Sequence, residues 1–228
     1  MNSESPRSFI YNPPKSAGFN ILFESEDFLV ISKTSGLLSV PGRLAEHSDS
    51  LEGRIQELYP QARIVHRLDM DTSGVMVMAL NADIHRNLGL QFERRKVQKV
   101  YVARVWGHME GKQGEINLPL ICDWPNRPKQ MVNYELGKAA LTYWKVISRE
   151  KTDSGEAVTR VHLYPYTGRS HQLRVHMLSI GHPILGDNLY AHEKALKASV
   201  RLQLHAQELS FHRPCDGKRQ KFFEACSF

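Results

Sequence analysis

Apolar residues form short runs and alternating stretches separated by polar turns, a pattern that predicts several β-strands. The two runs 21–23 and 28–32 flank the polar segment 24–27, which is typical of a β-hairpin. In residues 99–107 the alternation places Tyr101, Ala103 and Val105 on one face of a strand. The segments predicted as strands are 21–23, 28–32, 75–80, 99–107, 140–150, 157–165 and 201–211.

Three other segments have the spacing and end signals of helices. Residues 48–60 follow a possible N-cap at Ser48 or Ser50 and stop at Pro60, and a second helix begins at a predicted cap, Asp83. Residues 171–181 predict a third helix that ends at Gly181. Strands do not alternate strictly with helices, so we expect an α/β (α+β) fold with a mixed, largely antiparallel sheet flanked by helices and loops.

The length of 228 residues and the absence of an internal repeat or linker favour one domain, which we place at residues 19–228. Residues 1–18, rich in Ser, Pro and Asn, are predicted to form a flexible tail. We find neither a secretory signal nor an apolar run of membrane-spanning length. The three scattered cysteines argue against a disulfide framework, so we expect a cytoplasmic protein without a membrane partner.

The net charge of +6 and the pI of about 9.2 favour a polyanionic partner, RNA or DNA first. Sequence motifs for dinucleotides, for the phosphates of nucleotides and for zinc are absent, so we expect no cofactor and no metal. The histidines His171 and His176 are five residues apart and would not share a helix face as zinc ligands do.

Two clusters of polar residues could carry chemistry. One is His66-Arg67-Leu68-Asp69 before the turn 72–74, and the other is the segment 168–176 with Arg169, His171 and Arg174. A carboxylate in a loop suits catalysis, and arginines near a helix start suit anions. Taken alone, each cluster equally fits an ordinary ion pair or a solvated helix face.

Several segments resemble the sequence motifs of one protein family, both in their residues and in their order along the chain. The sequence HRLDMDTSG (66–74) matches the motif H-R-L-D-x-x-T-S-G of the RluA family of RNA pseudouridine synthases at every fixed position. The segments YVARV (101–105), GRSHQLRVHM (168–177) and GHPILGDNLY (181–190) resemble its later motifs, in the expected order. The first motif departs from the family, because Thr34 stands where Lys-Pro-x-Gly usually has proline.

The resemblance implies one pseudouridine synthase catalytic domain that isomerises uridines without a cofactor. Asp69 would act as nucleophile or base, Arg174 would keep it ionised, and Tyr101 would pack against the uracil. Enzymes that act on a base commonly flip it out of its stack into a pocket. Arg67 would then fill the vacated space or hold the flanking phosphates. Further RNA-binding residues would be Arg169, His171, Arg127 and Lys129.

The resemblance also implies the partners, which are tRNA and 23S rRNA, acted on by a monomer. Within the family, enzymes with both substrates modify the anticodon stem-loop of tRNA at position 32 and 23S rRNA at position 746. Two alternatives stay open: an RNA-binding protein without catalysis, and a glycosidase, which would need two carboxylates flanking the bond. Asp71 is a competitor of Asp69 on the same face of the loop, and His66 is interpreted as a structural residue.

Overall fold

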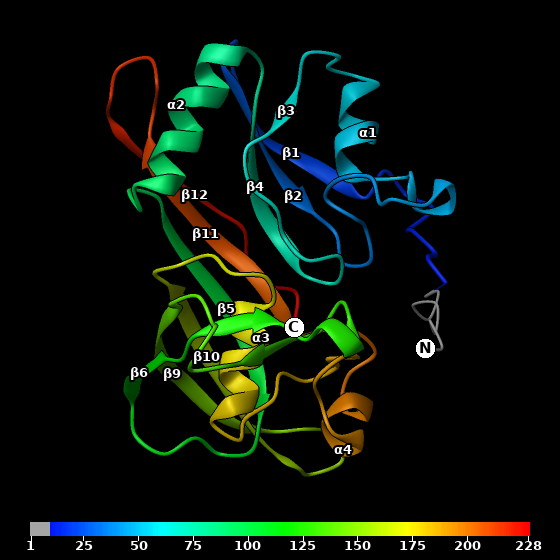
Figure 1. Ribbon diagram of the computed structural model, residues 1–228, viewed down its shortest axis with the longest axis vertical. Coiled ribbons are helices and arrows are strands. Elements are labelled where there is room, and N and C mark those ends of the chain that lie inside the picture. Colours follow the sequence, from blue (N-terminus) through cyan, green and yellow to red (C-terminus); the bar gives the residue numbers. More distant parts are fainter. Residues whose placement is uncertain (1–9) are drawn as a thin grey trace.

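The computed structural model describes residues 10–228, which form four α-helices and twelve strands (Figure 1). The helices are α1 (Leu51–Gln56), α2 (Ala82–Glu93), α3 (Gln172–Ser179) and α4 (Glu193–Lys197). The strands are β1 (Phe19–Glu24), β2 (Phe28–Lys33), β3 (Arg63–Ile64), β4 (Ser73–Ala79), β5 (Gln98–Trp106), β6 (Gln113–Asn117), β7 (Leu120–Cys122), β8 (Gln130–Val132), β9 (Leu141–Lys151), β10 (Ala157–Pro165), β11 (Leu204–His212) and β12 (Arg219–Phe223).

Ten strands make one sheet, in which eight follow the order β1-β2-β4-β11-β5-β10-β9-β6. Strand β12 pairs with β11, and β3 pairs with β4. Among the described strands only β4 and β11 pair in parallel, so the predicted mixed, largely antiparallel sheet is confirmed. The small second sheet is the pair β7–β8. Figure 1 shows the long strands β5 and β11 running between a part with α1 and α2 and a part with α3 and α4.

In the part with α1 and α2, both faces of the sheet are covered. Every residue of β2 and β4 is buried, and successive residues of each strand enter two different apolar clusters. Leu51 and Ile55 of α1 pack against one face, and Leu88 of α2 packs against the other. Two-sided burial explains why residues 75–80 are continuously apolar and do not alternate.

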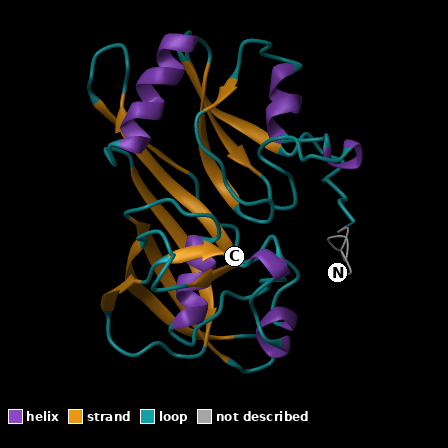
Figure 2. Cartoon of the chain, viewed as in Figure 1, coloured by secondary structure: helices purple, strands orange, loops and turns teal. Residues whose placement is uncertain are grey.

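In the other part, α3 covers the sheet beside the central strands (Figure 2). Leu173 and Met177 of α3 pack against Ala103 and Val105 of β5, in a cluster that also holds residues of β10. Tyr101 contacts this cluster and the cluster under α1. It therefore lies where the two parts of the core meet.

The predicted helices and the hairpin 21–32 are confirmed, with differences at the helix ends. Ser50 is the N-cap of α1, and its side chain accepts the N–H of Gly53. The prediction of Asp83 as the cap of α2 was wrong, because the cap is Asn81, whose Oδ1 accepts the N–H of Ile84. Asn81 has the extended backbone that an N-cap needs, whereas Asp83 already lies in the first turn.

The first nine residues of the predicted tail lie outside the described part of the chain. From residue 10 onward the tail is hydrogen-bonded to the domain. Tyr11 donates its hydroxyl to the carbonyl of Asp49, and Arg54 donates to the carbonyls of Pro14, Ser16 and Ala17. None of the helices in the described chain has the length and apolar character that crossing a membrane requires.

Candidate active site

One cavity of about 470 Å3 lies over the junction of the two parts of the core. It brings together side chains from the loop before β4, from β5, and from the segment that leads into α3. Six of the eight predicted site residues line it: Arg67, Asp69, Tyr101, Arg169, His171 and Arg174. The folded chain therefore unites two clusters that lie about a hundred residues apart in sequence.

Asp69 lies in a loop whose backbone is fixed by hydrogen bonds to its carbonyl groups. The N–H of Thr72 donates to the carbonyl of Asp69 at 3.1 Å, which closes the turn. The buried hydroxyl of Ser39 donates to the carbonyl of Leu68, and the hydroxyl of Ser35 donates to that of Asp71. The Asp69 carboxylate is partly exposed to the cavity. A fixed backbone with an accessible carboxylate suits a group that must meet a substrate in one orientation.

Lys33 adds a further anchor to the same loop. Its fully buried ammonium donates to the carbonyls of Thr34, Leu37 and Met70 at 2.9, 2.7 and 2.8 Å. Burial lowers the pKa of Lys33 to about 7, although the carboxylates of Asp71 and Asp69 oppose this shift. Lys33 thus joins the first motif to Met70, the residue that follows Asp69. Thr34, which stands where the family has proline, donates its hydroxyl to the carbonyl of Gly18.

Arg174 lies close to Asp69, but its principal partner is Asp187, which the sequence analysis did not single out. Arg174 Nε and Nη2 donate to the two oxygens of Asp187 at 2.8 and 2.6 Å, whereas Nη1 lies 3.7 Å from Asp69 Oδ2. Both members of the tight pair are buried, with side chains 3% and 0% exposed. Asp187 therefore fixes the guanidinium, and its remaining edge faces Asp69.

Tyr190 connects Arg174 with His171 and with the β7–β8 hairpin. The guanidinium carbon of Arg174 lies 5.2 Å from the centre of the Tyr190 ring. The Tyr190 hydroxyl accepts the N–H of Gln130 at 2.8 Å and lies 2.7 Å from Nδ1 of His171. Burial raises the pKa of Tyr190 to about 12 and lowers that of His171, so the phenol and the imidazole meet as neutral groups. His171 is the N-cap of α3 and has a left-handed backbone, with φ of 52°.

Tyr101 enters the cavity from β5 with its phenol next to Asp69. Burial raises the pKa of Tyr101 far above its ordinary value, and the negative charge of Asp69 adds to this shift. The hydroxyl stays protonated at neutral pH and can donate a hydrogen bond or a proton. The ring provides a flat apolar wall on which a base can pack.

The neighbours of Asp69 in the motif have other surroundings. His66 stacks on Phe92 at 4.5 Å between ring centres, and its Nε2 accepts the N–H of Val77. Burial, aided by the charge of Lys99, lowers the pKa of His66 to about 3, so the imidazole is neutral and serves as a hydrogen-bond acceptor. Arg67 is exposed at the cavity. Asp71 accepts a hydrogen bond from Asn188 at 3.2 Å and does not line the cavity.

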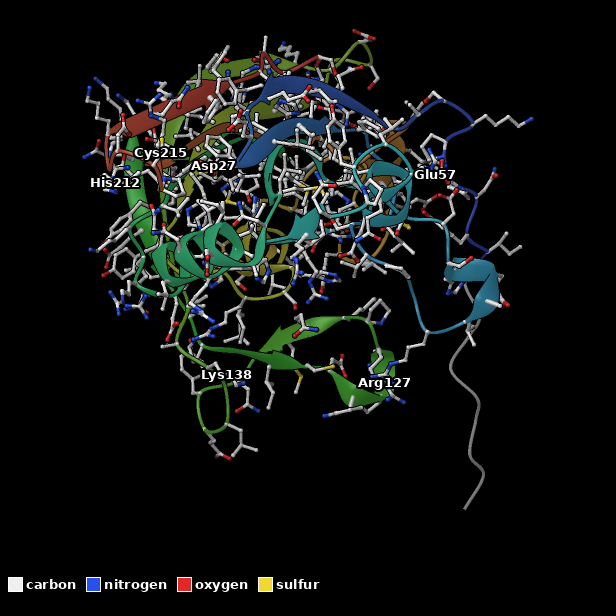
Figure 3. The ribbon with its side chains drawn as sticks, turned by 90° about the horizontal axis from the view of Figure 1, so that it is seen from above. Asp27, Glu57, Arg127, Lys138, His212 and Cys215 are labelled. Carbon is white, nitrogen blue, oxygen red and sulfur yellow. The ribbon has the colours of Figure 1, made fainter. Side chains whose placement is uncertain are left out.

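Arg127 and Lys129 lie outside the cavity, in the connection between β7 and β8. Figure 3 shows the segment of Arg127 standing away from the main body of the protein. The Arg127 guanidinium lies 4.6 Å from the centre of the exposed Trp124 ring. The hairpin is joined to the cavity wall through the bond between Gln130 and Tyr190.

The histidines of α3 do not form a metal site. His176 is buried and lies 2.9 Å from Thr142 Oγ1 and 3.0 Å from the carbonyl of Leu118, whereas His171 faces Tyr190. Within residues 10–228 no group of three histidine, cysteine or acidic side chains is arranged to hold an ion.

Comparison with known proteins adds an independent result. A family model described as RNA pseudouridylate synthase matches residues 27–179. The dual-specificity RNA pseudouridine synthase RluA of Vibrio parahaemolyticus is 54% identical over 218 residues, which are 96% of this chain and 87% of the relative. The protein of the same name from Escherichia coli (strain K12) is 52% identical over 218 residues, 96% of this chain and 98% of the relative.

Two solved human structures share the fold. RNA Pseudouridylate Synthase Domain Containing 1 superimposes with a TM-score of 0.77 at 29% identity, over 94% of this chain and 86% of that chain. RNA Pseudouridylate Synthase Domain Containing 4 gives a TM-score of 0.71 at 24% identity, over 90% and 88%. The second likeness concerns the fold alone.

Proposed function

Since the chain belongs to the RNA pseudouridylate synthase family and is an RNA pseudouridine synthase, we propose that Asp69 carries its reaction and that tRNA and 23S rRNA are its substrates. The family predicted from the motifs is confirmed by the matching family model and by relatives more than half identical over nearly the whole chain. The proposal assigns the chemistry to residues and narrows the substrate class.

The position of the Asp69 carboxylate is the observation that supports this assignment best. It is the carboxylate of the loop that faces the cavity, between the Tyr101 phenol and the Arg174 guanidinium. The reaction breaks the bond between C1′ of ribose and N1 of uracil and forms a bond from C1′ to C5. An ionised carboxylate serves as nucleophile or as base in that exchange.

Arg174 and Tyr101 have supporting roles in the proposal. Arg174 is held in place by Asp187 and keeps one edge toward Asp69, so its positive charge faces the carboxylate. Because part of its charge is already neutralised by Asp187, Arg174 acts on Asp69 less strongly than an isolated arginine would. The Tyr101 ring packs against the uracil, and its hydroxyl, protonated at neutral pH, assists the transfer of the C5 proton.

The basic side chains around the cavity define the proposed RNA surface. Arg67 and Arg169 are exposed at its rim, so they can contact phosphates or enter the space left by a flipped uridine. Arg127 and Lys129 extend this surface along the hairpin that stands away from the body. His171 contributes by holding the hairpin to α3 through Tyr190.

We propose uridines of the tRNA anticodon stem-loop and of a loop in 23S rRNA as targets, because relatives that are 54% and 52% identical over nearly the whole chain are called dual-specificity enzymes. The isomerisation adds no group to the uridine and removes none, so we propose that it needs no cofactor. A monomer in the cytoplasm, where both RNAs reside, completes the proposal.

The test uses tRNA that carries tritium at C5 of uracil. Formation of the C1′–C5 bond expels this tritium to water, so its release measures the reaction. We expect release by the wild type and a decrease of about 10³-fold or more for Asp69→Asn, with RNA binding retained. The matched control is Asp71→Asn, two residues away and outside the cavity, which should stay within about threefold of wild type.

Other outcomes lead to other conclusions. Wild-type rates for Asp69→Asn together with an inactive Asp71→Asn would move the reaction to Asp71. RNA binding without any tritium release, on tRNA and on 23S rRNA fragments, would favour an RNA-binding protein without catalysis. Free uracil among the products would favour a glycosidase.

A further inference from the structure

A second cavity, of about 430 Å3, adjoins the active-site cavity and has no role in the reaction described above. The two cavities share five wall residues: Phe92, Lys99, Thr167, Gly168 and Arg169. The far side of the second cavity is formed by the end of α2 and by Tyr166. A molecule that occupies the first cavity can therefore continue into the second without leaving the surface.

Lys99 lies in the wall between the two cavities. Its side chain is half-buried, and within the described chain no carboxylate or carbonyl pairs with its ammonium. A Cβ atom added to Gly168 would lie 3.9 Å from Lys99 Nζ, which places the ammonium beside the backbone of residue 168. A partly buried cation is costly without a partner. A phosphate reaching this wall would supply the missing negative charge.

Arg95 and Tyr166 form a flat surface on the far side of the second cavity. The Arg95 guanidinium lies over the Tyr166 ring at 4.9 Å from its centre. Arg95 is exposed and Tyr166 is 50% exposed, so both keep a surface for a ligand. Arg95 also has a φ of 57°, because it follows the C-cap of α2 in the left-handed conformation that commonly ends a helix.

We propose that this second cavity binds the nucleotide next to the target uridine in the same RNA. Lys99 and Arg169 contact its phosphate, and its base stacks on the surface formed by Arg95 and Tyr166. Unpaired RNA bases commonly stack on aromatic rings and on arginine planes. The charge fits as well, because the cavity has three cations, Arg95, Lys99 and Arg169, against one anion, Glu93. This proposal rests on the proposed function, since it needs a uridine in the first cavity.

The experiment measures binding of a fluorescein-labelled tRNA anticodon stem-loop by anisotropy. We expect Arg95→Gly and Tyr166→Ala each to raise Kd about tenfold, as the loss of one stacked base would. Glycine accepts the positive φ, so Arg95→Gly should fold normally. Tyr166→Phe retains the ring and should bind within about twofold of wild type. The matched control is Arg86→Ala, an exposed arginine of α2 that lines neither cavity.

RNAs with one abasic residue identify the stacked nucleotide. An abasic residue on one side of the target uridine should weaken binding to the wild type about tenfold and should not weaken binding to Tyr166→Ala further. Equal losses in both proteins at both neighbouring positions would overturn the proposal, as would wild-type Kd values for Arg95→Gly and Tyr166→Ala.

The tritium assay on the wild type separates this proposal from the proposed function. Tritium release with unaffected binding in the variants would retain the reaction and overturn the second cavity as a nucleotide site. Absence of release on tRNA and on 23S rRNA fragments, with binding that still depends on Arg95 and Tyr166, would overturn the proposed reaction and support the nucleotide site.

Discussion

Replacement of Asp187 by asparagine tests whether the buried ion pair holds the site together. Asp187→Asn preserves the shape of the side chain but exchanges one acceptor oxygen for an NH2 group. The two short bonds from Arg174 then face a neutral group that can accept only one of them. The nearest remaining negative charge is Asp69, at 3.7 Å and partly exposed.

The burial of both side chains sets the expected magnitude. Breaking a buried pair by removing one partner costs about 3–5 kcal/mol, because the other charge stays buried without compensation. The total unfolding free energy of a protein is about 5–15 kcal/mol, so the variant would lose a large part of it. With a slope of about 2 kcal/mol per molar urea, the urea midpoint should fall by about 1.5–2.5 M.

Urea unfolding followed by tryptophan fluorescence measures this change. The matched control is Asp216→Asn, which removes the carboxylate of the exposed pair Arg213–Asp216 and should leave the urea midpoint unchanged. A midpoint for Asp187→Asn within about 0.3 M of wild type would refute the reasoning. Arg174 would then be held by contacts other than its bond to Asp187.

Four further substitutions test the Tyr101 hydroxyl, two glycines and the pKa of Lys33. Tyr101→Phe keeps the stacking ring and loses the hydroxyl. We therefore expect RNA binding, measured by anisotropy, to be retained and the rate of tritium release to fall about 10²-fold or more. An unchanged rate would exclude the hydroxyl from proton transfer. Gly74→Ala should lower the urea midpoint of the protein strongly, because the new Cβ would lie 2.3 Å from the carbonyl oxygen of Ala206. Gly89→Ala in α2 meets nothing within 4 Å and should stabilise the protein by up to about 1 kcal/mol. Equal urea midpoints for the two variants would contradict this reasoning. Because burial lowers the pKa of Lys33 to about 7, the unfolded chain binds more protons than the folded protein above that pH. The unfolding free energy should therefore rise between about pH 7.5 and about pH 9.5, by up to about 1.4 kcal/mol per pH unit. Lys33→Met should lose this contribution, and an identical slope in both proteins would contradict the pKa shift.

The elements that the sequence predicts well are those whose hydrophobic pattern belongs to a large buried surface. Residues 75–80 and 99–107 form central strands, so their pattern directly reflects the core. The strands β6 and β12 were not predicted, because each has a single buried residue, Ile116 or Phe222, among polar ones. A strand at the side of a sheet needs little apolar surface, and its pairing depends on the neighbouring strand.

The candidate site shows the same division. Asp69, Tyr101 and Arg174 were identified by resemblance, and the fold brings them to one cavity. Asp187 was missed although it lies in the motif 181–190, because a single carboxylate in a loop has no periodic pattern that reports its burial. A charged residue among Ile, Leu and Gly is a signal that could have identified it, since a buried charge needs a partner. The partner itself depends on how the loop after α3 folds back.

The polar side chains around the active-site cavity form two groups with different consequences. Lys33, Arg174 and Asp187 have partners at 2.6–2.9 Å within the protein, so their positions are set before RNA binds. Lys99 and the buried Thr72 hydroxyl, by contrast, have no hydrogen-bond partner within the described chain, although both residues line the cavity. The first group fixes the carboxylate and guanidinium for the reaction, which lowers the entropy cost of reaching the reactive geometry. In the second group the Lys99 ammonium is left for the RNA, so we expect the loss of Lys99 to weaken RNA binding and to leave the folded protein stable.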